Sequence, residues 1–261
     1  MRTALFPALA VLAIVALLFV PPIPQDPAYH RFADQRTLFG IPNFWNVASN
    51  LPFLLVALWG IRGLLSSTAF IDPWERAAYA IFLFGIGLVA VGSSYYHARP
   101  NNDTLVWDRL PMTIGFMSLL AMVIGERISP RAGRLLLFPL IVIGIASVFF
   151  WQSSGDLRFY GFVQFYTLLA LPLMVALFPP RYTGTAGIVA MAAFYVLAKL
   201  LESFDRAIGS VIVTGGHPWK HVAAAIGVLC YVISVERRRP IQASRAPGVS
   251  SLPGLARRDR L

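Results

Sequence analysis

Long apolar segments recur along this 261-residue chain, and they constrain its fold more than any other feature. Runs of about 17–22 residues are long enough to cross a hydrocarbon core of about 30 Å as helices. Such segments must be helical, because no water is present in the core to satisfy their backbone groups. Only 13% of the residues are charged, against about 25% in soluble domains. The sequence therefore predicts an all-α integral membrane protein.

The apolar runs predict eight helices, at about 4–20, 43–64, 76–97, 107–125, 133–151, 159–178, 185–203 and 217–235. The first run could instead be a signal peptide. It is followed by a proline-rich stretch at 21–24 without a small-x-small cleavage site, which favours a retained helix. We expect an extra N-terminal transmembrane helix in residues 1–22, a seven-helix membrane domain at 23–235 and a basic, disordered cytoplasmic tail at 236–261.

The net charge of +10 comes mostly from arginine, since Lys199 and Lys220 are the only lysines. No nucleic-acid motif accompanies the charge, so no nucleic-acid partner is expected, and no protein partner is implied. With Arg2 on the cytoplasmic side and eight crossings, the arginine-rich loops and the tail fall inside, as membrane topology favours. The preference for arginine is compatible with a GC-rich bacterial genome, which suggests a multi-pass protein of the bacterial inner membrane. The single cysteine, Cys230, excludes an intramolecular disulfide and a CxxC metal site.

Three of the four histidines lie in two short segments. His97 ends the predicted third helix, whereas His217 and His221 begin the eighth with an i, i+4 spacing that puts them on one helix face. Ser93 precedes His97 by one turn, and Asp108 begins the predicted fourth helix. The topology drawn from the arginines brings all of them to the outer end of the membrane.

Two histidines on one helix face, a third from elsewhere and a nearby carboxylate suit an open zinc site with three protein ligands. The carboxylate could act as a general base, and a hydroxyl could steady a developing oxyanion. These are the parts of a metal-dependent amide or ester hydrolase, acting on a lipid cleaved near its headgroup. Haem ligation and a receptor with structural polar residues are the alternatives. Two ligands one turn apart on one helix favour a compact metal over haem.

Other polar residues allow a structural interpretation beside a functional one. Asp108 could be a charge favoured at a helix start. Lys199 and Glu202, spaced i, i+3, are best read as a structural ion pair at membrane depth. A polar stripe opens the second helix, either for hydrogen bonding between helices or for support of the metal site or a second ion. Its members are Asn43, Asn46 and Asn50.

At these residues the chain resembles the alkaline ceramidase family of the CREST superfamily, which also contains adiponectin-type receptors and GPI-remodelling proteins. The superfamily pattern is a Ser four residues before a His, an Asp at the start of the next helix and a terminal HxxxH. It is matched by Ser93, His97, Asp108, His217 and His221. Motifs more typical of ceramidases are Phe44-Trp45-Asn46 with Ser49-Asn50, Leu110-Pro111-Met112, and Gly216-His217 with Trp219. The resemblance covers about residues 30–235.

The resemblance implies a seven-helix core in which the three histidines hold Zn²⁺, Asp108 deprotonates water and Ser93 assists at the carbonyl. The implied reaction is hydrolysis of ceramide, or a related N-acyl lipid, to a fatty acid and a sphingoid base or amine. The topology drawn from the arginines places the active site toward the periplasm. A lipid esterase of the same superfamily and a heptahelical receptor-like protein with structural zinc are the alternatives.

The chain departs from the family pattern in two places. The helix in residues 1–22 is additional to the seven-helix core. Animal ceramidases of this type carry an acidic calcium-binding loop with a Glu at the position of Asn43, but here the loop has only Asp26 and Asp34 as acidic residues. Since Ca²⁺ prefers several oxygen ligands with carboxylates prominent among them, calcium is possible but not favoured. Many bacteria lack sphingolipids, so the amide could belong to another N-acyl lipid.

Overall fold

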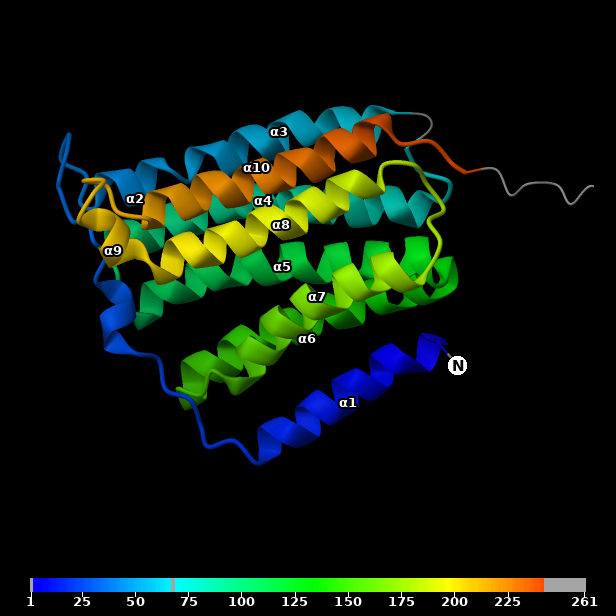
Figure 1. The fold of residues 1–261 in the computed structure, drawn as a ribbon, viewed down its shortest axis with the longest axis horizontal. Coiled ribbons are helices and arrows are strands. Elements are labelled where there is room, and N and C mark those ends of the chain that lie inside the picture. The colour runs from blue at the N-terminus through cyan, green and yellow to red at the C-terminus, as the bar shows by residue number, and fades with distance from the viewer. Residues whose placement is uncertain (1, 67–68, 242–261) are drawn as a thin grey trace, which may run out of the picture.

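A computed structural model describes residues 2–66 and 69–241 of the chain. Within these ranges, seven helical segments are long and apolar enough to cross a membrane, and they run alongside one another in one bundle (Figure 1). The first consists of α2 (Phe44–Ala48) and α3 (Leu51–Leu65). The others are α4 (Pro73–Ala98), α5 (Asn102–Arg127), α6 (Pro130–Ser154), α7 (Arg158–Leu177), α8 (Thr185–Ser203) and α10 (His217–Arg237). The predicted fold class is confirmed.

Four shorter elements complete the described chain: η1 (Arg2–Ala4), α1 (Leu5–Leu18), η2 (Pro27–His30) and α9 (Asp205–Gly209). The apolar α1 corresponds to the predicted N-terminal helix and is shorter than the seven spans. It lies at one side of the bundle in Figure 1 and contacts α7, where the Tyr166 hydroxyl donates to the Phe6 carbonyl at 2.9 Å. Its crossing of a membrane stays a prediction.

The chain that follows α1 is tied to the turn between α6 and α7. The Asp156 carboxylate accepts a hydrogen bond from the Ile23 backbone N–H at 3.2 Å. The Arg158 guanidinium binds the same carboxylate, which lowers the pKa of Asp156 to about 2. Arg158 also donates to the carbonyls of Leu17 and Val20 at 3.1 and 2.5 Å. The end of α1 is thereby held against the rest of the bundle.

The start of α5 differs from the prediction. The helix begins at Asn102 rather than near Trp107, because Asn101 caps it. The Asn101 side chain accepts a hydrogen bond from the Thr104 N–H at 2.9 Å, and the Thr104 hydroxyl accepts one from the Asn101 N–H at 3.2 Å. This reciprocal capping converts a polar stretch that looks like a loop into the first helical turn. Asp108 therefore lies beyond the first turn, and its interpretation as a helix-start charge is wrong.

The predicted helix at 43–64 is divided at Ser49 and Asn50. The Asn50 amide donates to the Asn46 carbonyl at 2.9 Å, so a side chain takes the place of a backbone donor. Pro52, at the start of α3, has no N–H to continue the hydrogen-bond ladder. The interruption lies at the same end of the bundle as the histidines, where the Ser49 hydroxyl contacts His221.

The basic segment after residue 235 begins as part of the folded bundle. α10 continues to Arg237, and the following Arg238 is buried. Its Nε donates to the Ala69 carbonyl at 2.6 Å, and its guanidinium pairs with Glu126 at 3.5 Å. Residues 242–261, the remainder of the predicted tail, lie outside the described residues.

Close packing of α4 against α5 depends on Gly92. A Cβ atom placed on Gly92 would lie 1.9 Å from the backbone carbonyl oxygen of Trp107, so only a hydrogen atom fits there. Small residues that allow such close backbone approach are typical of helix interfaces in membranes. Ser93 and Asp108 directly follow Gly92 and Trp107 in the sequence, so this contact sets the separation of the two helices beside both residues.

We expect Gly92→Ala to push α4 and α5 apart and to lower the free energy of unfolding by about 1–3 kcal/mol, the usual cost of overpacking. Thermal unfolding in detergent measures the change as a lower Tm. Gly87→Ala is the matched control on the same helix, because its added methyl would meet only the Ala57 Cβ at 3.6 Å, an ordinary contact. Equal Tm values for the two variants would contradict the close-packing argument.

Candidate active site

Three histidines from two distant segments meet at one end of the bundle. His97 is near the end of α4, and His217 and His221 are in the first turns of α10. Their ring nitrogens offer one candidate ligand atom each, all within 4.8 Å of one another. All three side chains are buried, with relative exposures of 1%, 4% and 6%. The ends of α4 and α10 that carry them lie on the same side in Figure 1.

The geometry of this histidine cluster fits a small metal ion. The Nε2 atoms of His97 and His221 are 3.2 Å apart. Two ligands of a tetrahedral zinc ion, each at about 2.0–2.1 Å from the metal, lie ~3.3–3.4 Å apart. The Nε2 atom of His217 is buried and has no hydrogen-bond partner among the described residues. A buried nitrogen without a partner is costly, and a metal at the centre of the cluster would remove that cost.

Hydrogen bonding orients the ring of His221. The Ser49 hydroxyl donates to the Asn46 carbonyl at 3.2 Å, so it is free to accept a hydrogen bond from His221 Nδ1 at 2.8 Å. A proton on Nδ1 leaves the Nε2 lone pair directed at the other histidines. Such a partner on the far ring nitrogen is what fixes the tautomer of a metal-binding histidine.

His217 is positioned from a different part of the chain. Asp205, at the start of α9, accepts hydrogen bonds from the backbone N–H groups of His217 at 2.8 Å and Ala33 at 2.9 Å. The ring of Phe32 lies 4.6 Å from the ring of His217 and 4.8 Å from that of His97, centroid to centroid. The segment before α2 thus covers the histidines with an aromatic ring.

The predicted asparagine stripe binds backbone carbonyls. Asn43, in the left-handed region at φ 48°, donates to the His97 carbonyl at 2.8 Å and so connects two helical segments. Asn46 donates to the Asp34 carbonyl at 3.0 Å. These contacts agree with the structural interpretation of the stripe, and the Asn43 contact also supports the end of α4 that carries His97.

The two acidic residues of the loop before α2 are engaged locally. Both oxygens of Asp34 accept hydrogen bonds from Arg36, which lowers the pKa of Asp34. Asp26 accepts a hydrogen bond from the Ala28 N–H at 2.8 Å and caps η2. In the described ranges, the histidine cluster is the one group of three or more metal-binding side chains, so no calcium site of that kind is found there.

A cavity of about 880 Å³ extends from the histidine cluster into the bundle. Ser93, Asp108 and His221 line it. Most of the remaining lining is apolar. The cavity runs along α5 from Asp108 to Leu119, a rise of about 16 Å. Since the hydrocarbon core is about 30 Å thick, this depth corresponds to one leaflet and therefore to one lipid acyl chain.

The additional helix α1 forms one wall of the same cavity. Its contribution consists of small and aliphatic side chains: Leu9, Leu12, Ala13, Ala16 and Leu17. α7 and α8 line the cavity beside it. α1, which precedes the seven long spans, is therefore part of the enclosure around the apolar cavity.

Charged residues gather where the cavity approaches the histidines. The predicted ion pair between Lys199 and Glu202 is present, and Glu202 also binds Lys220 at 2.5 Å. The Tyr29 hydroxyl donates to the same carboxylate at 3.2 Å. All four side chains line the cavity. The pair predicted as structural is therefore part of a larger polar group beside the candidate site.

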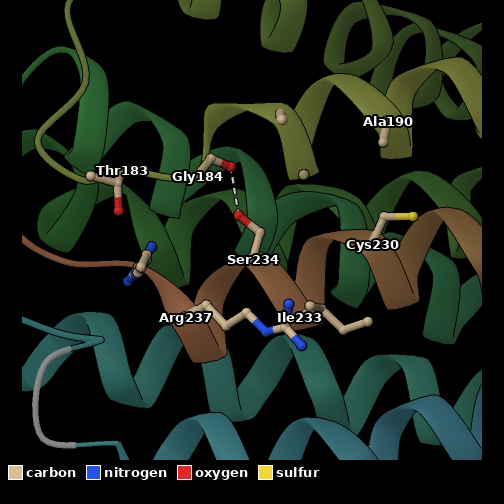
Figure 2. Close-up of a pocket in the computed structure, with 10 residues that line it drawn as sticks. Thr183, Gly184, Ala190, Cys230, Ile233, Ser234 and Arg237 are labelled. Carbon is tan, nitrogen blue, oxygen red and sulfur yellow. Dashed lines mark hydrogen bonds between the residues drawn. The ribbon is translucent and has the colours of Figure 1, made fainter.

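A second pocket, of about 430 Å³, lies between α8 and α10 (Figure 2). Gly184, Cys230 and Ser234 line it, and the Ser234 hydroxyl donates to the Gly184 carbonyl at 2.5 Å. Ser234 is thirteen residues beyond His221 on α10, a rise of about 20 Å. This pocket is remote from the histidine cluster.

Comparison with known protein families identifies the family to which the chain belongs. Residues 38–200 match the Ceramidase family. The chain belongs to this family, because the match covers more than half of its length. The matched region contains Ser93, His97 and Asp108, whereas His217 and His221 follow it and join the site through the fold. A search of curated proteins finds no match.

Sequence reasoning did not predict which residues would contact and cover the three histidines. Ser49 and Asp205 contact the histidine segments, and Phe32 covers them. Ser49 lies in a motif that resembles ceramidases, which is a usable signal for its importance but not for its partner. Asp205 and Phe32 carry no local signal, because their partners are brought to them by the fold.

We expect the purified protein to hold a divalent metal in near-stoichiometric amount, and His221→Ala to lose it. Removing one of three ligands leaves a site that cannot complete its coordination. Elemental analysis of the detergent-purified protein measures this. His30→Ala is the matched control, because His30 lies outside the cluster and binds Tyr96 and Asn102 instead. A wild-type protein without metal would show that the three imidazoles are packed for another reason.

We expect Ser49→Ala to weaken metal binding by about 10–100-fold, since the partner of a ligating histidine orients its ring. A competition titration with a chromophoric chelator gives the affinity. Ser94→Ala is the control, because the Ser94 hydroxyl also binds α2, through the Val47 carbonyl at 3.2 Å, but contacts no histidine. Equal affinities in the two variants would remove Ser49 from the metal site.

Proposed function

We propose that this protein is a zinc-dependent membrane amidohydrolase that cleaves the N-acyl amide of ceramide or a related lipid. The products would be a free fatty acid and a sphingoid base or amine. One observation carries the proposal: Ser93, Asp108 and His221 line a single cavity whose depth suits one acyl chain. Membership of the Ceramidase family supports a hydrolase acting on amide bonds and a lipid substrate.

In the proposed mechanism, His97, His217 and His221 hold the zinc ion. When bound, the ion would supply Lewis-acid activation of water and of the scissile carbonyl. The three histidines supply neutral ring nitrogens from two helices, and their buried position keeps bulk water away from the reacting groups. The apolar cavity binds the acyl chain and places the amide at its polar end.

Asp108 is the proposed general base. Its carboxylate would accept a proton from the attacking water and return it to the nitrogen of the leaving amine as the C–N bond breaks. Ser93 would donate its hydroxyl proton in a hydrogen bond to the carbonyl oxygen, where negative charge develops. Both side chains line the same cavity as His221, which supports these two roles.

Two alternatives differ in chemistry or in class. A lipid esterase of the same superfamily would use the same residues on an oxygen ester. A receptor-like protein would hold zinc for structural purposes, and such a site is normally closed by a fourth protein ligand. The cluster in the described residues has three histidines and no fourth metal-binding side chain, which favours an open, hydrolytic site.

We also propose an arrangement in the membrane. Positive charge on the loops favours the histidine end of the bundle facing outward, toward the periplasm if the source is bacterial, with the C-terminal segment in the cytoplasm. The domain division is proposed as α1 with its linker, the seven-helix bundle and the basic C-terminal segment. Calcium is not assigned a role, because both loop carboxylates are engaged locally.

We expect Asp108→Asn to lower kcat by about 10²–10⁴-fold, the usual contribution of a general base. Ser93→Ala should lower kcat by about 10²–10³-fold, as for other oxyanion donors. Release of fatty acid from a fluorescent ceramide, and from a fluorescent acyl ester, measures both the activity and the bond preference. Metal content is the control and should stay at the wild-type level in both variants. A metal-loaded wild type that cleaves neither lipid would contradict the proposal, whereas cleavage of the ester alone would favour the esterase.

A further inference from the structure

The polar end of the cavity carries a surplus of positive charge. Four basic side chains line the cavity, namely Arg109, Arg158, Lys199 and Lys220, against two acidic ones, Asp108 and Glu202. Arg158 is compensated by Asp156 at 2.7 Å, outside the cavity lining. The three remaining cations therefore face two carboxylates. A neutral headgroup such as that of ceramide provides no partner for this surplus charge.

Glu202 is shared between two lysines. One of its oxygens accepts from Lys199, and the other accepts from Lys220 at 2.5 Å and from the Tyr29 hydroxyl at 3.2 Å. A lysine ammonium has three donors, and one hydrogen bond is found for each of these ammonium groups among the described residues. Both lysines thus retain donors and together exceed the charge of Glu202 by one.

Arg109 adds a further cation behind this cluster. Its guanidinium is buried between the rings of Trp151 and Tyr160, at 4.0 and 4.7 Å from their centroids. It donates to Gln25 at 2.6 Å. In the part of the chain that the structure describes, Arg109 forms no ion pair. An uncompensated buried charge is costly at membrane depth, where charges are normally paired or functional.

We propose that Lys199 and Lys220 form an anion-binding subsite at the polar end of the cavity, and that the lipid cleaved here bears a carboxylate or phosphate on its amine side. This assignment rests on the proposed function. The acyl chain occupies the apolar part of the cavity beyond Asp108, so the amine portion lies at the charged end. Lys220 directly precedes His221, and both lysines line the same cavity as Asp108, which places the subsite beside the amide.

Binding and hydrolysis test the subsite with matched lipids. Full-length protein in neutral detergent is titrated with a long-chain alkyl phosphate and with the alcohol of the same chain, by isothermal calorimetry. Hydrolysis is measured on an N-acyl amino acid and on ceramide with the same acyl chain. We expect the wild type to prefer the anionic member of each pair. Lys199→Gln should reduce the preference, measured as a ratio of Kd or of kcat/KM values, by about tenfold.

Two variants serve as controls. Lys199→Arg keeps the charge and should restore most of the preference. Arg206→Gln removes one exposed charge on α9, at the same end of the bundle but outside the cavity. It should change the preference by less than about twofold, because exposed charges are screened by salt. An equal loss in Arg206→Gln would mean general attraction to anionic amphiphiles and would overturn the subsite.

The outcomes distinguish failure of the proposed anion subsite from failure of the proposed hydrolase. If every variant hydrolyses both lipids with the same ratio of kcat/KM values, the subsite is overturned and the amidohydrolase stands. A Lys199-dependent binding preference without hydrolysis of any N-acyl lipid would support the subsite and contradict the hydrolase. If Lys199→Gln relieves inhibition by free fatty acid and leaves the substrate preference unchanged, the lysines bind the released carboxylate, and the headgroup assignment is wrong.

Discussion

The backbone contact between α4 and α5 at Gly92 is the constraint on which the site depends. The carbonyl of Trp107 occupies the space that any side chain at Gly92 would need, so the helices meet backbone to backbone. Within lipid, hydrophobicity alone does not hold helices together, and close packing of this kind takes its place. Because Ser93 and Asp108 are the next residues on each helix, the same contact brings a hydroxyl and a carboxylate to one cavity.

The histidine cluster depends on the ends of helices and on the chain segments that cover them. Ser49 orients His221, Asp205 binds the backbone of His217, and Asn43 binds the carbonyl of His97. Each contact comes from a residue outside the helix it supports. Such partners satisfy polar groups that lipid cannot and hold ligating rings in place. Asn43 and Phe32 both belong to the segment before α2, and we infer that this segment is part of the site.

Sequence reasoning predicted the seven long spans closely, because span length and apolarity are local properties. It also predicted which histidines meet, since His217 and His221 share a helix face and charge topology placed His97 at the same level. Its errors were local as well. The start of α5 and the break at Asn50 depend on side chains that hydrogen-bond to nearby backbone groups. The polarity of a residue does not by itself show whether it caps or interrupts a helix or belongs to a loop.

The sequence by itself determined that the chain forms membrane helices, and which residues are chemically able to bind a metal and move a proton. Only the tertiary structure decided that Ser93, Asp108 and His221 open onto one cavity, that α1 walls it, and that two lysines share Glu202 beside it. The physical reason is that hydropathy specifies which segments are buried in lipid but not how each helix is rotated and tilted against its neighbours. Those angles follow from packing between residues far apart in the chain, as at Gly92, and they set both the volume of the cavity and the charges that face it.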